Sequence, residues 1–193
     1  MTATDLHKIG AIKFGDFTLA SGRKSPYYVD LRLVYSNPEV FEKFASMCAD
    51  LVQKKVDGKV DRIAGVPISG IPLATLVSHK LSLPLVLVRK EAKTHGREKK
   101  IEGELEKGDK VVLVEDLVTV GGSVLEAVDA IKKEGGEVSD VVVILDREEG
   151  ALDSLSKAGI KLHSCMRISE VVEKLREDGL LDSEQADSIL ENI

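Results

Sequence analysis

Residues 111–123 read VVLVEDLVTVGGS, and in this stretch an apolar run passes without a break into a glycine-rich loop. The first four positions are all apolar, which is typical of a strand buried on both faces of a parallel sheet. Two adjacent carboxylates follow, Glu115 and Asp116, and then the loop at residues 119–123. The stretch therefore predicts a buried strand that ends at a binding loop.

Similar apolar runs recur along the chain and alternate with helical patterns. Residues 71–81 and 123–136 have helical spacing, and the second of these segments closes at Gly135 and Gly136. Strands that alternate with helices predict an α/β fold in which a parallel sheet is covered by helices on both faces. The predicted strands are residues 62–66, 84–88, 110–115 and 140–145.

The two ends of the chain flank this core. A helix is expected over residues 38–54 with Pro38 in its first turn, and two extended segments joined by a turn are expected over residues 17–32. Residues 169–193 indicate two short helices that break near Gly179. With 193 residues and no linker-like tract, residues 1–193 are predicted to form a single domain.

The composition excludes several classes of protein. The chain is 43% hydrophobic and 31% charged, as expected of a soluble globular protein, and no apolar run approaches the ~20 residues that span a bilayer. The N-terminus lacks the pattern of a secretory signal, so a cytoplasmic location without membrane contact is expected. A formal charge of −6 disfavours nucleic acid as a partner. Cys48 and Cys165 show no zinc-site spacing and no disulfide framework.

The loop at residues 119–123 has the composition of an anion site. Gly121 and Gly122 let the backbone approach a ligand, the hydroxyls of Thr119 and Ser123 can donate, and the following helix adds N–H groups. The Walker and GxGxxG patterns are absent. The alternative interpretation is a strand-to-helix turn beside solvated acids. Two carboxylates next to a phosphate site would repel the ligand unless they bind its sugar hydroxyls or a hydrated Mg²⁺.

An apolar run, an acidic pair and TxGGS in this order resemble the phosphoribosyl diphosphate (PRPP) signature of type I phosphoribosyltransferases. Other segments narrow the resemblance to the orotate phosphoribosyltransferase family. They are FGDFTLASGRKSPYYVDLR at 14–32, GVPISGIPLA at 65–74, RKEAKTHG at 89–96 and LDR at 145–147.

The resemblance implies the type I phosphoribosyltransferase fold, with a small N-terminal hood formed largely by about residues 1–35. It also implies transfer of ribose 5-phosphate from PRPP to N1 of orotate with Mg²⁺, giving orotidine 5′-phosphate and diphosphate in pyrimidine biosynthesis. No direct metal ligand from the protein is expected. The catalytic residues it implies are Lys93, His95 and Asp116. The residues it implies for PRPP are Arg89, Lys90, Lys93, His95, Glu115, Asp116, Thr119, Val120, Gly121, Gly122 and Ser123.

For orotate, the resemblance implies Thr119, Arg147, Tyr27 and Tyr28. The planar guanidinium of Arg147 would pair with the orotate carboxylate. The alternative for Arg147 is a salt bridge at a strand end, and the alternative for the two tyrosines is ordinary packing.

Residues 90–103 hold five Lys or Arg against three Glu, and Ala92 and Ile101 are their only apolar residues. Without an apolar period, this segment is expected to be a mobile catalytic loop rather than part of the core, although such a stretch can also be a solvated charge run. By resemblance, Lys93 and His95 enter the neighbouring subunit's site, which implies a homodimer with shared sites.

Two positions depart from the pattern of many bacterial relatives, because Ala20 and Ser69 stand where those proteins carry lysines. Two rival functions also fit parts of the sequence. A purine phosphoribosyltransferase would have no use for a carboxylate-binding Arg147. A nucleotide-sensing transcription regulator on the same fold would need a DNA-binding module, which the short N-terminus and the net charge do not offer.

Overall fold

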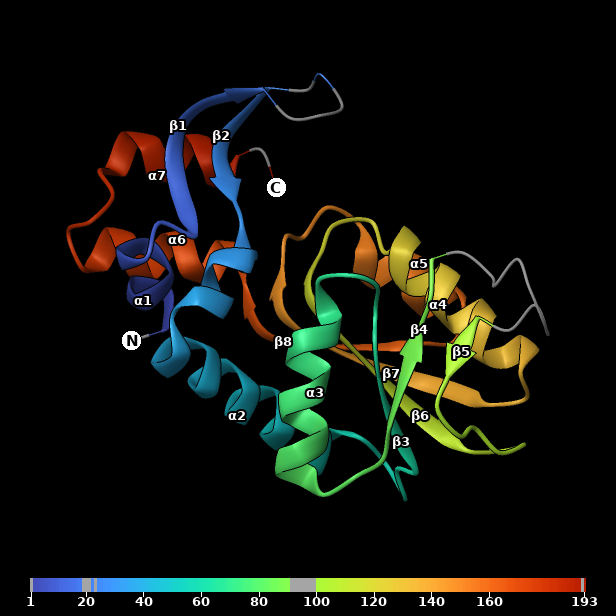
Figure 1. Ribbon diagram of the computed structural model, residues 1–193. Helices are drawn as coiled ribbons and strands as arrows, with labels where there is room; N and C mark the ends of the chain where they lie inside the picture. Colours follow the sequence, from blue (N-terminus) through green and yellow to red (C-terminus); the bar gives the residue numbers. More distant parts are fainter. Residues whose placement is uncertain (1, 19–21, 23, 91–99, 192) are drawn as a thin grey trace.

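The computed structural model describes residues 2–18, 22, 24–90, 100–191 and 193 (Figure 1). Figure 1 shows a lobe built around a central sheet and a second lobe in which a hairpin of strands lies against helices. In the part of the chain that is described, no helix is long and apolar enough to cross a membrane.

The central sheet has six strands in the order β5-β4-β3-β6-β7-β8. All neighbouring strands run parallel except β4 and β5, which are antiparallel. The strands are β3 (Arg62–Gly65), β4 (Leu85–Val88), β5 (Ile101–Glu102), β6 (Lys110–Val118), β7 (Glu137–Asp146) and β8 (Lys161–Arg167).

Helices cover both faces of this sheet, which explains why its strands are apolar at successive positions. On β6, Val112 and Val114 belong to the apolar cluster that includes Phe44, whereas Val111 and Leu113 belong to a second cluster. Helices α2 (Pro38–Lys55) and α3 (Gly70–Leu81) contribute to the first cluster, and α4 (Gly122–Lys133) and α5 (Ala151–Lys157) contribute to the second. The predicted α/β fold, with helices on both faces of the sheet, is confirmed.

The second lobe joins the two ends of the chain. Strands β1 (Ile12–Thr18) and β2 (Lys24–Val29) form an antiparallel hairpin, and the short 3₁₀ helix η1 (Leu31–Ser36) leads from it to α2. The hairpin and helices α1 (Thr2–Lys8), α6 (Ile168–Glu177) and α7 (Ser183–Leu190) contribute to one apolar cluster (Figure 1). This lobe is therefore built from both ends of the chain, whereas the resemblance implies a hood over about residues 1–35.

The predicted strands correspond to β3, β4, β6 and β7, and the predicted helices correspond to α2, α3, α4, α6 and α7. The sequence did not predict α1, α5, β5 or β8. The expectation that residues 90–103 stay outside the core is wrong at their end. There Ile101 pairs with Val88 across β4 and β5 and is 5% exposed, so this end of the segment is an edge strand.

Candidate functional site

The site lies where the winding of the sheet changes direction. From β3 the chain passes through α3 to β4, and from the adjacent β6 it passes through α4 to β7, on the opposite face and toward the opposite edge. A crevice opens at the carboxyl ends of two strands whose connections diverge in this way, and open α/β sheets bind ligands in such a crevice. The segments that follow β3 and β6 supply its walls.

Strand β6 extends beyond the end of β3 and carries the acidic pair into this crevice. The pairing of the two strands ends at Gly65 and Val114, so Glu115 and Asp116 come after the last pair. On the other side, β6 still pairs with β7, where Glu115 lies opposite Val143. The acids are thus held by a rigid strand on one side and are free of a neighbouring strand on the other.

A close approach by α3 encloses the acids from below. A Cβ on Gly70 would lie 2.4 Å from the backbone oxygen of Val114 and 3.0 Å from Oε1 of Glu115, so only glycine fits there. This approach brings the hydroxyl of Ser69 within 3.0 Å of Glu115 Oε1, to which it donates a hydrogen bond.

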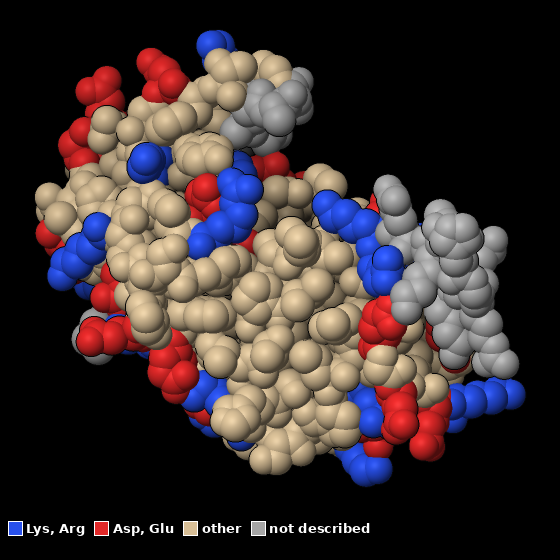
Figure 2. Space-filling model, viewed as in Figure 1, with Lys and Arg blue, Asp and Glu red and all other residues tan. Residues whose placement is uncertain are grey.

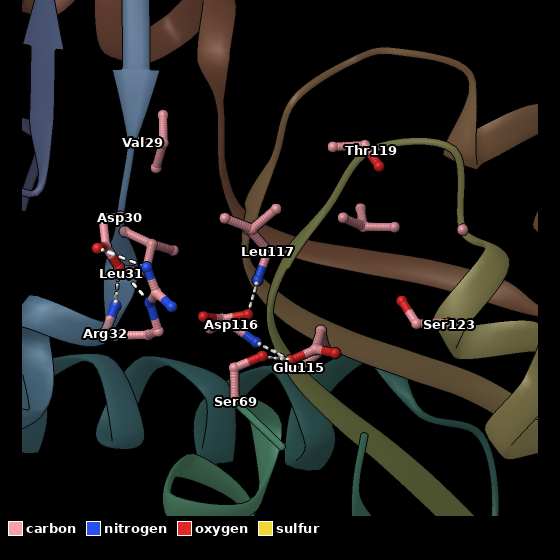
Figure 3. A pocket seen from close by; sticks show the side chains of 12 residues that line it. Val29, Asp30, Leu31, Arg32, Ser69, Glu115, Asp116, Leu117, Thr119 and Ser123 are labelled. Carbon is pink, nitrogen blue, oxygen red and sulfur yellow. Dashed lines mark hydrogen bonds and ion pairs between the residues drawn. The ribbon is translucent and has the colours of Figure 1, made fainter. Parts of the chain in front are cut away.

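The two acids are buried and share hydrogen bonds (Figure 3). Glu115 is 4% exposed and Asp116 is 6% exposed. The backbone N–H of Asp116 donates to Glu115 Oε1 over 2.9 Å, and that of Leu117 donates to Asp116 Oδ1 over 2.8 Å. Burial, and then the charge of Asp116, raise the pKa of Glu115 to about 9. Glu115 is therefore protonated at neutral pH in the ligand-free protein, and its carboxyl group can donate as well as accept.

The loop after β6 is held by its carbonyl oxygens. The N–H of Ala151 donates to the oxygen of Thr119 over 3.0 Å, and the hydroxyl of Ser154 donates to the oxygen of Val120 over 2.5 Å. Gly121 caps α4 with a φ of +86°, a conformation that side chains disfavour. Because the carbonyl groups bind α5, the loop can offer N–H and hydroxyl groups to an anion at the start of α4.

A cavity of about 320 Å³, here called the loop cavity, lies between this loop and the segment after β2. Figure 3 shows Asp30 and Arg32 on one side and Thr119 and Ser123 on the other, with the acids between them. Of the predicted PRPP residues in the loop at 119–123, Val120 and Gly122 do not line it. Its lining is Val29, Asp30, Leu31, Arg32, Ser69, Glu115, Asp116, Leu117, Val118, Thr119, Gly121 and Ser123.

A second cavity of about 470 Å³, here called the basic cavity, adjoins the first. The two share Arg32, Ser69, Glu115 and Ser123 as lining residues. Four basic side chains line the basic cavity against two acidic ones, which makes it locally cationic in an acidic protein. The basic residues are Arg32, Arg89, Lys90 and Lys100, and the acidic residues are Glu115 and Glu126.

Strand β5 positions part of this basic lining. The backbone N–H of Arg89 donates to the oxygen of Lys100 over 2.8 Å, and the Arg89 guanidinium pairs with Glu102 over 2.8 Å. The structure thus places the predicted residues Arg89 and Lys90 in one cavity. The other two residues predicted from this segment, Lys93 and His95, lie outside the described residues.

Of the residues predicted for orotate, Arg147 and Tyr27 lie against each other and line neither cavity. Arg147 is 7% exposed, its Nη2 lies 2.8 Å from Oε1 of Glu149, and its guanidinium carbon lies 4.8 Å from the ring centroid of Tyr27. The backbone N–H of Arg147 donates to the carbonyl oxygen of Val118, so the main chain at Arg147 lies beside the end of β6. Tyr27 is 5% exposed and Tyr28 is 38% exposed. Among the predicted orotate residues, only Thr119 lines the loop cavity.

Four charged lining residues are not among the site residues predicted from the sequence: Asp30, Arg32, Lys100 and Glu126. Asp30 and Arg32 follow directly after β2, at the end of the segment YYVDLR. Polar residues that follow a strand are a signal for a site, but here only the tertiary contact between η1 and β6 shows that they face the acids.

Comparisons with known proteins agree with this geometry. The model of the phosphoribosyl transferase domain family matches residues 32–165. The chain is 42% identical over 166 residues to an orotate phosphoribosyltransferase of Methanocaldococcus jannaschii, an alignment that covers 86% of this chain and 92% of that protein. It is 44% identical over 165 residues to the orotate phosphoribosyltransferase of Methanothermobacter thermautotrophicus, covering 86% and 89%.

Solved structures show the same likeness. The orotate phosphoribosyltransferase from Aeropyrum pernix superimposes with a TM-score of 0.81 at 33% identity, covering 91% of this chain and 98% of that one. The Mycobacterium tuberculosis enzyme in complex with 5-phospho-alpha-D-ribosyl 1-diphosphate superimposes with a TM-score of 0.71 at 28% identity, covering 89% and 99%.

Proposed function

The chain belongs to the phosphoribosyltransferase family, as an orotate phosphoribosyltransferase of pyrimidine biosynthesis, and we propose that its two adjoining cavities hold PRPP during transfer to orotate. The single observation that carries this placement is the continuity of the cavities. The loop cavity is lined by an anion loop and an acidic pair, and it adjoins a cavity lined by four basic side chains.

Each part of PRPP is assigned to a group of residues whose chemistry suits it. The 5′-phosphate binds the loop of residues 119–123, where hydroxyl groups and the start of α4 meet a negative charge. The ribose hydroxyls bind Asp116 and Glu115. The diphosphate extends into the basic cavity toward Arg89 and Lys90, where cations meet the charge that develops on it.

The reaction needs little covalent chemistry from the protein. The bond between C1 of the ribose and the diphosphate oxygen breaks, its electron pair leaves with the diphosphate, and N1 of orotate bonds to C1 while the N1 proton is released to solvent. The chain contributes by holding both reactants in line and by stabilising the departing charge with Arg89 and Lys90. We also place Lys93 and His95, by family resemblance, at the diphosphate during this step.

The acidic pair suits this role because of its protonation. A protonated Glu115 lowers the negative charge of the pair near the phosphate groups, which reduces repulsion of an anionic substrate. A carboxylic acid and a carboxylate together can both donate to and accept from two vicinal hydroxyl groups. The pair thus recognises a sugar diol while carrying a small negative charge.

Mg²⁺ fits the oxygen groups of this site as a companion of the substrate. Mg²⁺ prefers oxygen ligands, keeps several of its waters and is bound through one or two carboxylates together with substrate phosphates. The carboxyl groups that line the loop cavity belong to Asp30, Glu115 and Asp116, and the described residues contain no group of three or more side chains placed to hold a metal ion. When bound with PRPP, the ion would neutralise part of the diphosphate charge.

Orotate is placed between the end of β6 and the pair formed by Arg147 and Tyr27. Stacking on Tyr27 holds the guanidinium of Arg147 in one plane, and that plane can pair with a carboxylate. In the ligand-free protein the guanidinium of Arg147 forms an ion pair with Glu149. To bind there, the carboxylate of orotate has to displace the carboxylate of Glu149. Recognition of orotate over an uncharged base follows from this exchange.

A homodimer with shared sites completes the proposal. Figure 2 shows a broad surface over α3 that carries no charged side chain, and the cores of subunit interfaces are depleted in charged residues. Ile68, next to α3, is 73% exposed and also lines the basic cavity. A second subunit on this surface would therefore lie close enough to the site for its Lys93 and His95 to act there.

A base-competition assay tests the proposed substrate. Purified protein is given PRPP and Mg²⁺ with orotate, and adenine, hypoxanthine or uracil is then added as a competitor. We expect orotidine 5′-phosphate as the product and little inhibition by the other bases. Consumption of a purine in preference to orotate would favour the purine phosphoribosyltransferase instead.

A further inference from the structure

Arg32 occupies the junction between the loop cavity and the basic cavity. It lines both, although it belongs to η1 and lies outside the anion loop and outside the segment of residues 89–100. A ligand that extends from one cavity into the other passes the four residues that line both, and Arg32 is the basic residue among them. Arg32 is not among the residues for which the family resemblance implies a role.

Asp30 holds Arg32 in place and leaves part of its guanidinium available. Nε and Nη2 of Arg32 donate to the two carboxylate oxygens of Asp30 over 2.7 and 2.8 Å. A guanidinium carries five N–H donors, so this fork uses two of them. Among the described residues no acceptor takes the remaining three, and the side chain is 65% exposed. Arg32 is thus preorganised, with donors left for a ligand.

The charges around Arg32 favour an anionic ligand on the side of the basic cavity. Arg89, Lys90 and Lys100 line that cavity together with Arg32, so four cations surround one volume. The hydrogen bond to Asp30 raises the pKa of Arg32, and the charge of Asp116 contributes further. Arg32 therefore stays charged, and it lies within the electrostatic reach of the acid that we place at the ribose.

We propose that Arg32 binds the diphosphate group of PRPP at the point where this group leaves the ribose. This inference rests on the proposed function and adds a residue to it. An arginine suits the task because its planar fork can bind two phosphate oxygens at once while its other edge stays on Asp30. Orotate is the other anion in the reaction, but of the residues assigned to it only Thr119 lines the loop cavity, and none of them lines the basic cavity, where the other cations lie.

The test compares Arg32→Ala with wild type in steady-state kinetics. Loss of a charge-assisted hydrogen bond to a substrate costs affinity, so we expect the KM for PRPP and the inhibition constant of diphosphate to rise about tenfold. The KM for orotate should change less than about twofold, because the base lies elsewhere. Arg32→Lys keeps the charge without the fork and should show a smaller rise than Arg32→Ala.

Arg167→Ala is the matched control. Arg167 is 54% exposed, donates through the same two nitrogens to the nearby Glu170, and lines neither cavity. Its KM for PRPP should match that of wild type. Arg32→Gln, which keeps most of the side-chain volume, serves as a second variant if the alanine variant unfolds, and thermal melting checks each protein.

The outcomes separate the inference from the function on which it rests. If wild type converts orotate but both Arg32→Ala and Arg32→Gln keep the wild-type KM for PRPP, the role of Arg32 is wrong and the function stands. A KM for orotate that rises more than the KM for PRPP would place Arg32 at the base and would also overturn the inference. A wild-type protein that does not use orotate would refute the function itself.

Discussion

The acidic pair Glu115 and Asp116 poses the main physical problem at the residue scale, because it lies beside a loop suited to phosphate. Their side chains are 4% and 6% exposed, and two buried charges next to an anionic substrate would be costly. The raised pKa of Glu115 resolves this conflict, since one of the two carboxyl groups is neutral at physiological pH. The pair can then bind a diol while carrying less negative charge than two ionised carboxylates would.

This protonation predicts how the stability of the ligand-free protein depends on pH. The pKa of Glu115 rises from 4.5 to about 9 on folding, so between these values the folded state binds more protons than the unfolded state. The free energy of unfolding should therefore fall as pH rises through this window. Glu115→Gln cannot titrate, so the stability of wild type relative to this variant should decrease from pH 5 to pH 9 in thermal melts.

An unchanged difference between the two proteins across this range would mean that Glu115 is ionised in the folded state. Measurements from both melting and urea unfolding would show whether the two methods agree. PRPP should be omitted from these measurements, because it binds only the folded state and would mask the dependence of stability on pH.

Arg147 predicts a selective effect on one substrate. Removing its guanidinium in Arg147→Ala should raise the KM for orotate about tenfold or more, since a desolvated carboxylate loses its charged partner. The KM for PRPP should rise much less and serves as the internal control. Equal increases in both constants would place Arg147 away from the base and favour a purely structural ion pair with Glu149.

At the element scale, two glycines set the distance between α3 and the sheet. A Cβ on Gly65 would lie 2.6 Å from Cα of Ile71 and 2.8 Å from its backbone nitrogen, and Gly70 meets β6 in a similar way. These contacts let the start of α3 lie directly against the strand ends, which is how Ser69 reaches Glu115. The close packing of these elements, rather than any one side chain, builds the floor of the site.

Gly65→Ala should therefore destabilise the fold by about 1–3 kcal/mol, the usual cost of forcing extra volume into a packed core. Its melting temperature should fall by several degrees. Gly122→Ala is the control for stability, because a Cβ there meets no atom within 4 Å. If Gly65→Ala had the same melting temperature as wild type, a backbone shift of α3 would have to accommodate the methyl group, and the packing argument would be wrong.

The elements that the sequence predicted are those whose own residues specify them. Strands β6 and β7 have long runs of consecutive apolar residues, and α2 has a capping proline and an apolar face. Strand β8 was missed because only Met166 in it is buried and the strand lies at the edge of the sheet. The two residues of β5 form a strand only because β4 is next to them, so local sequence could not reveal it.

The same limit applies to the site. Glu115, Asp116 and most of the anion loop could be predicted, because they are contiguous and their spacing carries the chemistry. Arg32 and Asp30 lie in a different element, and their approach to β6 depends on how the hairpin packs. The pairing of Arg147 with Tyr27 likewise joins residues far apart in sequence, and the pairing with Glu149 depends on the turn after β7.

At the scale of the whole molecule, the N-terminal hairpin and the C-terminal helices close one end of the protein. The hydroxyl of Thr4 donates to Asp178 over 2.8 Å, which ties the first helix to the end of α6. One apolar cluster runs from this lobe into the face of the sheet that carries α2 and α3. The lobe therefore positions η1, and with it the wall of the loop cavity that faces the anion loop.

The proposed sharing of sites between subunits predicts complementation. Lys93→Ala and Asp116→Asn homodimers should each be nearly inactive, because each change removes one component from both sites. After subunits exchange in a mixture, about half of the dimers should be mixed and contain one site without a defect. Recovery of roughly a quarter of wild-type activity is expected on this account.

Exchange has to be confirmed independently, for example with two tags captured in sequence. If the exchanged mixture stays as inactive as the separate variants, Lys93 serves its own subunit. Wild type mixed with Lys93→Ala provides the reference for dilution of active sites.

The most direct test of the central claim is the rate of orotidine 5′-phosphate formation in a variant that lacks both carboxyl groups, Glu115→Gln combined with Asp116→Asn. Asp129→Asn, an exposed carboxylate on α4 that lines neither cavity, is the control. We predict that wild type and the control form one orotidine 5′-phosphate and one diphosphate per PRPP consumed, and that the double variant is folded but slower by about 100-fold or more. A folded double variant that works at the wild-type rate would contradict the assignment of this crevice as the place where PRPP reacts.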